Sequence, residues 1–600
     1  MPSDNANIAR HLAAMAARQP HIAALKVPRG RAPAGDIDYL TLSFAELAAE
    51  VAAWQSELTA RGVRRGDRVL VMVRPGLPLI AAAFALFAHG AVPIVIDPGM
   101  GLKSFLSCVA RSRPRALLGI PLARLISRIY RKTFRTVEVR IPASGSPTAR
   151  RAPNSQPSTL NSQLAASSSN ELAAILFTSG STGAPKGVCY THGMFDAQVE
   201  LIRSAYAIEP GEIDLPMLPI FALFNPALGM TTIVPEIDPS RPASVDPNKI
   251  IQAIRQEKVT SSFGSPTLWR KLAVHCHQHH IELPSLKRVL CAGAPVPPDL
   301  WDLMTPILPN GLLHSPYGAT EVLPVSTISA PEVLDGHGGG TDVAAEHGAG
   351  TCVGRPLPAN EVKIIAITDA PIATLADARE LPAGQIGEII VRGPTVTHSY
   401  DALPEATAAA KIRADDVGKS QTPNSKSQMT AHASGVPDSF GVCDLAFGVS
   451  GEARSPVFHR LGDTGYLGVD GRLWFCGRKA ERVETIDGPL YTEQVEPIFN
   501  THTDVRRCAL IGLGERGRQR AALVVEPTSM SLAQSSADCR RFARELREIA
   551  KRFPHTSPIM LFYFRDKLPV DVRHNAKIHR LALARWAADG ARGYESDPKR

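Results

Sequence analysis

The stretch that decides the fold reads Thr-Ser-Gly-Ser-Thr-Gly-Ala-Pro-Lys-Gly and runs from Thr178 to Gly187. The apolar run of residues 173–177 precedes it and predicts a buried strand. Glycines let the backbone approach a ligand closely, so that consecutive N–H groups can converge on an anion. Hydroxyl groups add hydrogen-bond donors, and a lysine adds a charge suited to phosphate. We therefore predict a loop that binds polyphosphate through Thr178, Ser179, Gly180, Ser181, Thr182, Gly183 and Lys186.

This loop differs from the phosphate loop of kinases and GTPases. That loop has the pattern G-x-x-x-x-G-K-[ST], which no segment of the chain fits. A flexible Gly/Ser turn is the alternative interpretation. The repeat of hydroxyl residues and glycines directly after a strand, ended by Pro185, Lys186 and Gly187, favours the phosphate site.

The bulk composition is that of an ordinary globular protein of 600 residues with a net charge of +9. Lysine and arginine are spread along the chain, and no basic stripe is interleaved with aromatic residues, which argues against nucleic acid as a partner. A basic surface aids solubility, and it could also support peripheral association with acidic membranes.

Cysteine usage and the start of the chain point to the cytoplasm. The nine cysteines are scattered, odd in number and without a CxxC pair, as is typical of a reducing compartment. Residues 1–20 lack the apolar core of a signal peptide. The most apolar stretch, Leu77 to Ile96, is broken by Gly90 and Pro93, so it predicts a buried helix and a strand instead of a membrane span.

Helical and strand-like segments alternate in the first 140 residues. Residues 44–58 and 79–87 have helical spacing, whereas residues 68–73 and 91–96 predict strands. This alternation predicts an α/β fold with parallel sheet. Near the end of the chain, further strands are expected at 507–513 and 521–525, followed by an amphipathic helix that carries Phe542, Leu546 and Ile549. Low-complexity inserts are expected at about 143–170, 331–350 and 413–456.

Two patterns resemble known sites without the context that such sites need. Gly512 to Gly517 fits G-x-G-x-x-G, but a strand-like run follows it where dinucleotide binding requires a helix, so a hairpin loop is expected. The histidine-rich stretch from His275 to His280 lacks the ligand spacing of a structural metal site and predicts a polar helix end.

The loop of Thr178 to Gly187 resembles the signature loop of the adenylate-forming superfamily, which includes acyl-CoA synthetases, peptide-synthetase adenylation domains and luciferases. This resemblance implies transfer of AMP from ATP to a carboxylate. Such a reaction needs cations, hydrogen-bond donors and alignment, because its transition state spreads negative charge over phosphate oxygens.

Further motifs of that superfamily follow in its usual order. Gly293-Ala294-Pro295 resembles the segment that contacts adenine, and the stretch from Ser315 to Glu321 resembles the (Y)GxTE motif. The resemblance implies that Tyr317 flanks adenine, that Thr320 reaches the α-phosphate and that Glu321 holds Mg²⁺. A carboxylate that shares Mg²⁺ with phosphate oxygens fits the preferences of that ion.

The last motifs imply two domains. Asp463 resembles the residue that binds the ribose hydroxyls, and Arg478 lies in the motif before the interdomain hinge, where it would contact ribose or phosphate. Lys577 resembles the lysine that bridges substrate carboxylate and α-phosphate. We therefore expect a large ATP- and acyl-binding domain at residues 1–478 and a small, mobile α+β lid at 479–600. Lys577, Thr320, Glu321 and Lys186 are the expected catalytic residues.

Longer strings resemble one subgroup, the β-lactone synthetases of bacterial long-chain olefin biosynthesis. The matching strings are residues 216–230, 474–483, 491–497 and 571–580. Many acyl-CoA synthetases carry a histidine on the acyl and thiol route where this chain has Ala222. Apolar side chains near that position are candidates for an acyl pocket or for ordinary core. These candidates are Phe221, Ala222, Phe224 and Met230.

The resemblance implies a 2-alkyl-3-hydroxyalkanoic acid as substrate, ATP and Mg²⁺ as cofactors, and no requirement for CoA. The 3-hydroxyl group would attack the acyl-adenylate and close a β-lactone; His192 is a candidate base or a packing residue. Other enzymes of olefin biosynthesis are the implied partners. A long-chain acyl-CoA synthetase is the alternative. The third interpretation is a non-catalytic binding protein of the same fold. The presence of Lys577, Glu321 and Asp463 argues against it.

Overall fold

The computed structural model describes residues 5–143, 160, 164–178, 184–238, 244–334, 344, 347–414, 456–570 and 577–595. Residues Ser179 to Gly183 of the predicted phosphate loop lie outside the described residues. So do residues 144–159, 335–343 and 415–455, which make up much of the three predicted inserts.

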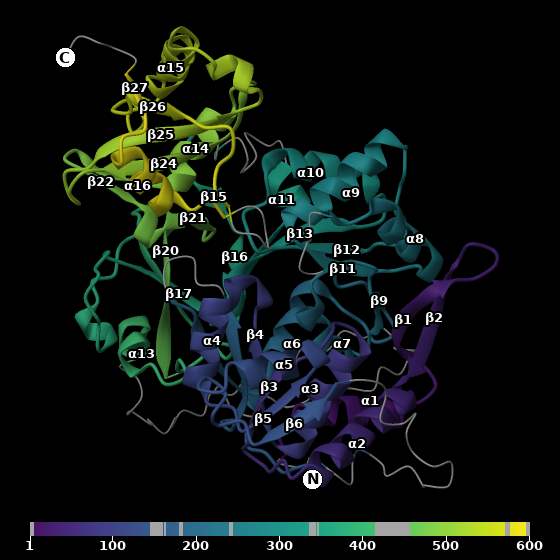
Figure 1. Ribbon diagram of the computed structural model, residues 1–600. Coiled ribbons are helices and arrows are strands. Elements are labelled where there is room, and N and C mark those ends of the chain that lie inside the picture. Colours follow the sequence, from purple (N-terminus) through teal and green to yellow (C-terminus); the bar gives the residue numbers. More distant parts are fainter. Residues whose placement is uncertain are drawn as a thin grey trace, which may run out of the picture.

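The predicted α/β fold is confirmed in the N-terminal half, where a six-stranded sheet has the order β6-β5-β3-β4-β7-β8. Figure 1 labels its strands β3 to β6. All neighbours in this sheet are parallel except β8, which runs antiparallel to β7. Its strands are β3 (Arg68–Met72), β4 (Val92–Ile96), β5 (Ala116–Gly119), β6 (Val139–Pro142), β7 (Leu172–Thr178) and β8 (Lys186–Thr191). Its helices are α2 (Phe44–Ala60), α3 (Leu77–His89), α4 (Gly101–Ser112), α5 (Pro121–Ile129) and α6 (His192–Tyr206).

A nine-stranded sheet of mixed direction packs beside the first, with the order β16-β14-β13-β12-β11-β9-β10-β1-β2. Its strands are β1 (Ala23–Arg31), β2 (Ile37–Ser43), β9 (Ile213–Asp214), β10 (Thr231–Ile233), β11 (Ser261–Gly264), β12 (Arg288–Cys291), β13 (Leu312–Ala319), β14 (Val322–Ser329) and β16 (Arg355–Pro356). The associated helices are α1 (Arg10–Arg18), α7 (Asn225–Leu228), α8 (Pro247–Glu257), α9 (Pro266–Gln278), α10 (Pro298–Met304) and α11 (Ala330–Leu334).

A third sheet has the order β15-β21-β20-β18-β17, with β19 paired to β20. Its elements are β15 (Thr351–Cys352), β17 (Glu361–Ile365), β18 (Gly387–Arg392), α13 (Pro404–Ala410), β19 (Lys411–Arg413), β20 (Val457–Leu467) and β21 (Leu473–Arg478).

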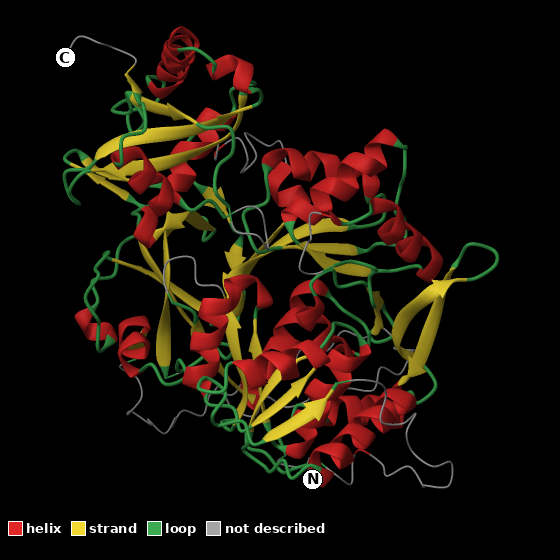
Figure 2. Ribbon diagram, viewed as in Figure 1, coloured by secondary structure: helices red, strands yellow, loops and turns green. Residues whose placement is uncertain are grey.

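The C-terminal part forms a smaller body of strands and helices, in yellow-green and yellow at the upper left of Figure 1. Figure 2 shows its helices on both sides of a four-stranded sheet of order β24-β25-β26-β27. Its elements are β22 (Val483–Thr485), β23 (Gly488–Leu490), α14 (Thr492–Asn500), β24 (Val505–Leu513), β25 (Arg520–Pro527), α15 (Ser536–Ala550), β26 (Leu561–Phe564), α16 (Arg580–Ala588) and β27 (Tyr594–Glu595).

The predicted elements have clear local causes. Helix α2 starts at a capping box in which the Ser43 hydroxyl accepts from the Glu46 N–H, and the Glu46 carboxylate accepts from the Ser43 N–H at 2.7 Å. Residues 512–517 lie in the β24–β25 hairpin, which confirms the predicted hairpin loop. His275 and His277 lie at the end of α9, and no metal-binding group of three side chains occurs in the described part of the chain.

Each sheet buries apolar residues from the helices packed on it. Phe44 of α2 and Phe84 of α3 lie in the core on one face of the six-stranded sheet, while Phe105 of α4 lies on the other face. In the C-terminal body, Phe499 of α14 and Phe542 of α15 pack on one face of the sheet. Within the described residues, no helix has the length and apolar character needed to cross a bilayer.

Candidate functional site

The candidate site is a cavity of about 2230 Å³ lined by residues of all three large sheets and of the C-terminal body. The strand ends and turns of these sheets carry the predicted motifs into it. The predicted residues that line it are Lys186, Phe221, Phe224, Gly293, Ala294, Pro295, Tyr317, Thr320, Glu321, Asp463, Arg478 and Lys577.

The adenine segment follows β12, and the (Y)GxTE motif occupies the end of β13 and the turn into β14. Gly293 has a φ of 102°, in the left-handed region that favours glycine. A Cβ atom on Gly318 would lie 2.6 Å from the carbonyl oxygen of Val322, so only glycine fits in this hairpin. These two glycines fix the path of the backbone around the cavity.

Asp463 lies at the centre of a buried cluster of polar side chains. It lies opposite Arg478 in the β20–β21 register, and the Arg478 Nη1 donates to its Oδ1 at 2.6 Å. The Tyr317 hydroxyl donates to its Oδ2 at 2.7 Å. Burial raises the pKa of Asp463, and the positive charges of Arg478 and Lys577 oppose that rise. The three predicted adenosine-side residues therefore meet through direct hydrogen bonds.

Lys577 lines the same cavity, close enough for its charge to act on Asp463. Residues 571–576, which precede it, lie outside the described residues. After it, Ile578 forms a β-bridge with Val570, and the His579 N–H donates to the carbonyl oxygen of Pro569 at 2.9 Å. The two residues that follow Lys577 are thus paired with Pro569 and Val570.

A second cluster surrounds Tyr400, which the sequence motifs did not single out. Its hydroxyl donates to Glu321 Oε1 at 2.7 Å. The Lys186 Nζ lies 4.8 Å from the centre of its ring, and the Lys411 Nζ lies 5.9 Å from it. These distances allow cation–π contacts. Tyr400 thereby links the predicted phosphate-binding lysine to the predicted metal ligand.

Lys411 on β19 is a further cation that sequence reasoning missed. It is buried, and its Nζ donates to the Thr397 hydroxyl at 3.3 Å. Burial lowers its pKa to about 7, the carboxylate of Glu321 raises it, and Lys186 lowers it again. Its neighbours Ala410 and His459 line the cavity, so Lys411 lies just behind the wall.

Only the two ends of the predicted phosphate loop lie among the described residues. Thr178 closes β7 and pairs in register with Lys186 at the start of β8. The Arg111 Nη1 donates to the carbonyl oxygen of Pro185 at 2.7 Å and lines the cavity. Ser179, Gly180, Ser181, Thr182 and Gly183 lie outside the described residues.

The four acyl-pocket candidates divide into two pairs. Phe221 and Phe224 line the cavity; Phe221 stacks on Phe263 at 3.7 Å between ring centres. Ala222 and Met230 are buried in the core and are not among the residues that line the described cavity. Their positions fit the interpretation of these two residues as ordinary core.

The apolar wall is larger than the sequence suggested. Helix α3 contributes Leu79, Ala83 and Phe87, which the helical spacing alone assigned to the core. Strands β3, β4 and β7 and helix α6 add more apolar side chains. These are Val71, Pro93, Val95, Ala173, Ala174, Leu176 and Phe195.

His192 begins α6 and is buried, and it is not among the residues that line the described cavity. Its Nδ1 accepts a hydrogen bond from the Ile8 N–H at 3.2 Å. Burial lowers its pKa to about 4. These contacts favour the packing role over that of a base.

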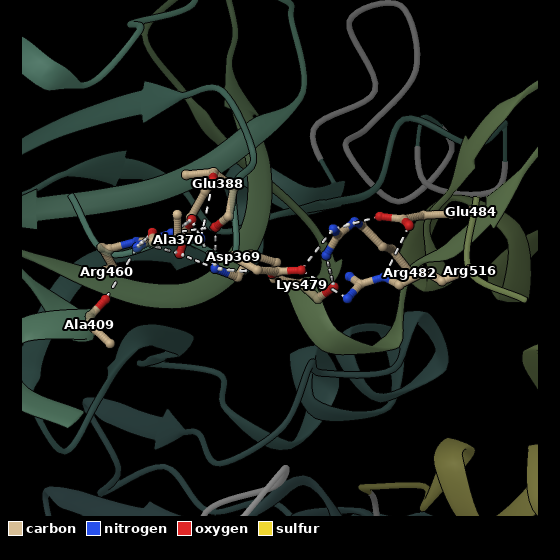
Figure 3. Close-up of polar contacts among 10 residues, drawn as sticks. Asp369, Ala370, Glu388, Ala409, Arg460, Lys479, Arg482, Glu484 and Arg516 are labelled. Carbon is tan, nitrogen blue, oxygen red and sulfur yellow. Dashed lines mark hydrogen bonds and ion pairs between the residues drawn. The ribbon is translucent and has the colours of Figure 1, made fainter. Parts of the chain in front are cut away.

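An ionic network lies at the junction with the C-terminal body (Figure 3). Arg460 and Lys479 both reach the buried carboxylate of Glu388, at 2.6 and 3.1 Å. Asp369 accepts from the Arg516 Nη1 at 2.9 Å, which joins the loop after β17 to the β24–β25 hairpin. This network was not foreseen, since its members are far apart in the sequence.

Comparison with known proteins agrees with this arrangement. The AMP-binding enzyme family matches residues 12–401. An olefin beta-lactone synthetase of Xanthomonas campestris pv. campestris is 43% identical over 589 residues, covering 97% of each chain. An olefin beta-lactone synthetase of Stenotrophomonas maltophilia is also 43% identical, over 97% of this chain and 98% of its own.

Among solved structures, ATP-bound MatB from Rhodopseudomonas palustris matches with a TM-score of 0.69 at 20% identity, over 98% of this chain and 99% of its own. That match concerns the fold. The two relatives show that this chain is similar to olefin beta-lactone synthetases. Together with the family match, they show that it belongs to the AMP-binding enzyme family.

Proposed function

We propose that the protein converts a long-chain 2-alkyl-3-hydroxyalkanoic acid to a β-lactone with consumption of ATP. The observation that carries this proposal is the 43% identity to two olefin beta-lactone synthetases along 97% of the chain. The convergence of Lys186, Glu321, Asp463 and Lys577 on one cavity supports it.

In the first step a carboxylate oxygen attacks the α-phosphorus of ATP. A C–O–P bond forms, the bond to the β-phosphate breaks, and pyrophosphate leaves. Lys186 and Lys577 line the cavity as cations that can offset charge on phosphate and carboxylate oxygens. Asp463, with two acceptor oxygens, suits the ribose hydroxyls.

In the second step the 3-hydroxyl oxygen attacks the activated carbonyl carbon. The new C–O bond closes the four-membered ring, the bond to AMP breaks, and the hydroxyl proton is released. An internal nucleophile has a high effective concentration when the site holds it aligned. The apolar wall, with Phe221 and Phe224, suits alkyl chains.

The residues present also fit Mg²⁺. Glu321 supplies one carboxylate in the cavity, and one or two carboxylates together with substrate phosphates are the usual ligands of this ion. When bound, Mg²⁺ would neutralise phosphate charge. Tyr400 orients Glu321 through its hydrogen bond.

We further propose that residues 479–600 act as a lid that carries Lys577, and that the hydroxy acid comes from other enzymes of olefin biosynthesis. A cytoplasmic location suits the eight described cysteines, all of which are free thiols. The alternative product is an acyl-CoA thioester. The alanine at position 222, where the thiol route of many acyl-CoA synthetases has histidine, favours the lactone.

The test is incubation with Mg-ATP and a 2-alkyl-3-hydroxyalkanoic acid without CoA, followed by mass spectrometry. We expect β-lactone, AMP and pyrophosphate. The matched substrate without the 3-hydroxyl group should give acyl-adenylate and no lactone. AMP release that depends on CoA, with a thioester as product, would contradict the proposal and establish the alternative.

A further inference from the structure

Helix α5 turns three large apolar side chains outward. Leu122, Leu125 and Ile129 follow the spacing of one helix face and are 59%, 51% and 64% exposed. The face packed on the sheet carries Ala123 and Ser127, which are 1% and 0% exposed, together with the partly buried Ile126. Surface helices normally bury their apolar face, so an exposed one marks an interaction surface.

The same region is purely cationic. Between Asp97 and Glu138 the chain has no acidic residue, so the even spread of charge expected from the whole sequence does not hold here. This segment contains nine basic residues: Lys103, Arg111, Arg113, Arg115, Arg124, Arg128, Arg131, Lys132 and Arg135.

Four of these cations lie at the end of α5 or in the turns that follow it. Arg128, Arg131, Lys132 and Arg135 are exposed, and none forms an ion pair within the described part of the chain. Tyr130, 37% exposed, lies among them. We call Leu122, Leu125, Ile129 and these four cations the α5 surface.

Helix α15 provides the contrast. It is also rich in arginine, but Phe542 and Leu546 point into the core, and Arg541 lies near Asp538 and Glu545. Its charges are balanced and its apolar side is covered, as in an ordinary solvated helix. The α5 surface differs in both respects.

We propose that the α5 surface docks the protein on an anionic lipid bilayer. Exposed leucine and isoleucine side chains can enter the boundary between headgroups and acyl chains, while neighbouring lysines and arginines meet lipid phosphates. The absence of carboxylates from the segment matches a partner of uniform negative charge. Residues of α5 are not among those that line the described cavity, so docking leaves the site free.

The experiment is flotation of the full chain with phosphatidylcholine vesicles, with and without phosphatidylglycerol. We expect binding that requires phosphatidylglycerol and weakens with salt. The variant R128Q/R131Q/K132Q should bind about tenfold to a hundredfold more weakly. The variant L125S/I129S should lose the part of the binding that survives added salt.

The matched control is R540Q/R541Q/R544Q, which removes as much charge from α15. Equal loss in this control would overturn the proposal, because net charge alone would then explain the binding. No flotation of the wild type with anionic vesicles would also overturn it. ATP-dependent AMP release from a short, soluble hydroxy acid should be unchanged in all variants, which separates this test from that of the proposed function.

Discussion

Arg580 follows Lys577 by three residues and holds Glu496 by two hydrogen bonds, from Nε to Oε1 at 2.7 Å and from Nη2 to Oε2 at 2.6 Å. Its Nη1 donates to Glu481 at 2.9 Å. Such a bidentate pair fixes geometry as well as charge. Glu496 lies on α14 and Glu481 just after the predicted hinge, so Arg580 ties the segment that follows Lys577 to both.

The substitution Arg580→Lys keeps the positive charge but loses the bidentate hydrogen bonds to Glu496. We expect adenylate formation to slow about tenfold or more, since a misplaced catalytic group costs rate steeply. ATP–pyrophosphate exchange measures the formation of acyl-adenylate. Lactone release from pre-formed acyl-adenylate should change little, because Lys577 acts in the first step.

Arg520→Lys is the matched control, as Arg520 pairs with Glu595 at an exposed position of the same body. It should leave both steps unchanged. If Arg580 were merely structural, Arg580→Lys would lower the rates of both steps and also the thermal midpoint. That result would contradict the positioning role.

Tyr400 contacts Lys186 through its ring and Glu321 through its hydroxyl. Two substitutions therefore separate the role of the ring from the role of the hydroxyl group. Tyr400→Phe should raise the Mg²⁺ concentration needed for half-maximal activity several-fold, because Glu321 loses its orienting donor. Tyr400→Leu should also weaken ATP binding, since the ring beneath Lys186 is lost. Titration calorimetry with ATP measures the second effect, and equal ATP affinity in the two variants would contradict it.

The resemblance to the superfamily motifs assigned Tyr317, Asp463 and Arg478 to the adenosine side, and in the structure these three side chains lie together. Most motifs lie at the end of a strand or in the turn that follows, and neighbouring strands bring such ends together. Asp463 instead lies within β20. The β20–β21 register, which places Asp463 opposite Arg478, needed only an antiparallel pairing of two nearby strands. The phosphate loop stays a prediction, because Ser179 to Gly183 lie outside the described residues.

Tyr400 and Lys411 could not be predicted in this way, because their places depend on pairings between distant segments. A β-bridge joins Val188 to Tyr400, and β19 pairs with β20 so that Lys411 lies opposite His459. Neither residue belongs to a motif with its own chemical signature. The inward face of α3 was missed for a different reason: apolar residues of a cavity wall and of a core have the same periodicity.

Asp369 and Arg516 join the large part of the chain to the C-terminal body at the junction drawn in Figure 3. Asp369→Asn removes this charge pair. We expect ATP–pyrophosphate exchange to slow several-fold, since the body that carries Lys577 loses one tie. The thermal midpoint should hardly move, because exposed pairs contribute about 1 kcal/mol or less. Unchanged exchange, with the matched variant Asp470→Asn as reference, would show that the pair does not hold the body in place.

His192 gives a prediction for pH. Its Nδ1 accepts the Ile8 N–H, so a proton cannot be added there without losing that bond, and burial lowers its pKa to about 4. Glu171 and Asp196 oppose this lowering, whereas Arg10 and Arg65 reinforce it. In the unfolded chain the pKa of histidine is about 6.5. Between these two values the unfolded state binds more protons, so stability is lost as the pH falls from about 6.5 to about 4.

The contribution of His192 should reach about 1 to 2 kcal/mol at pH 5 relative to pH 7. His192→Asn places an amide oxygen near the position of Nδ1 and cannot titrate. The thermal midpoint of the variant should therefore fall less between pH 7 and pH 5 than that of the wild type. His314, whose pKa burial also lowers to about 4, is present in both proteins and cancels in this comparison. Parallel decline of the two midpoints would mean that His192 is protonated in the folded protein, and the acceptor role of its Nδ1 would then be wrong.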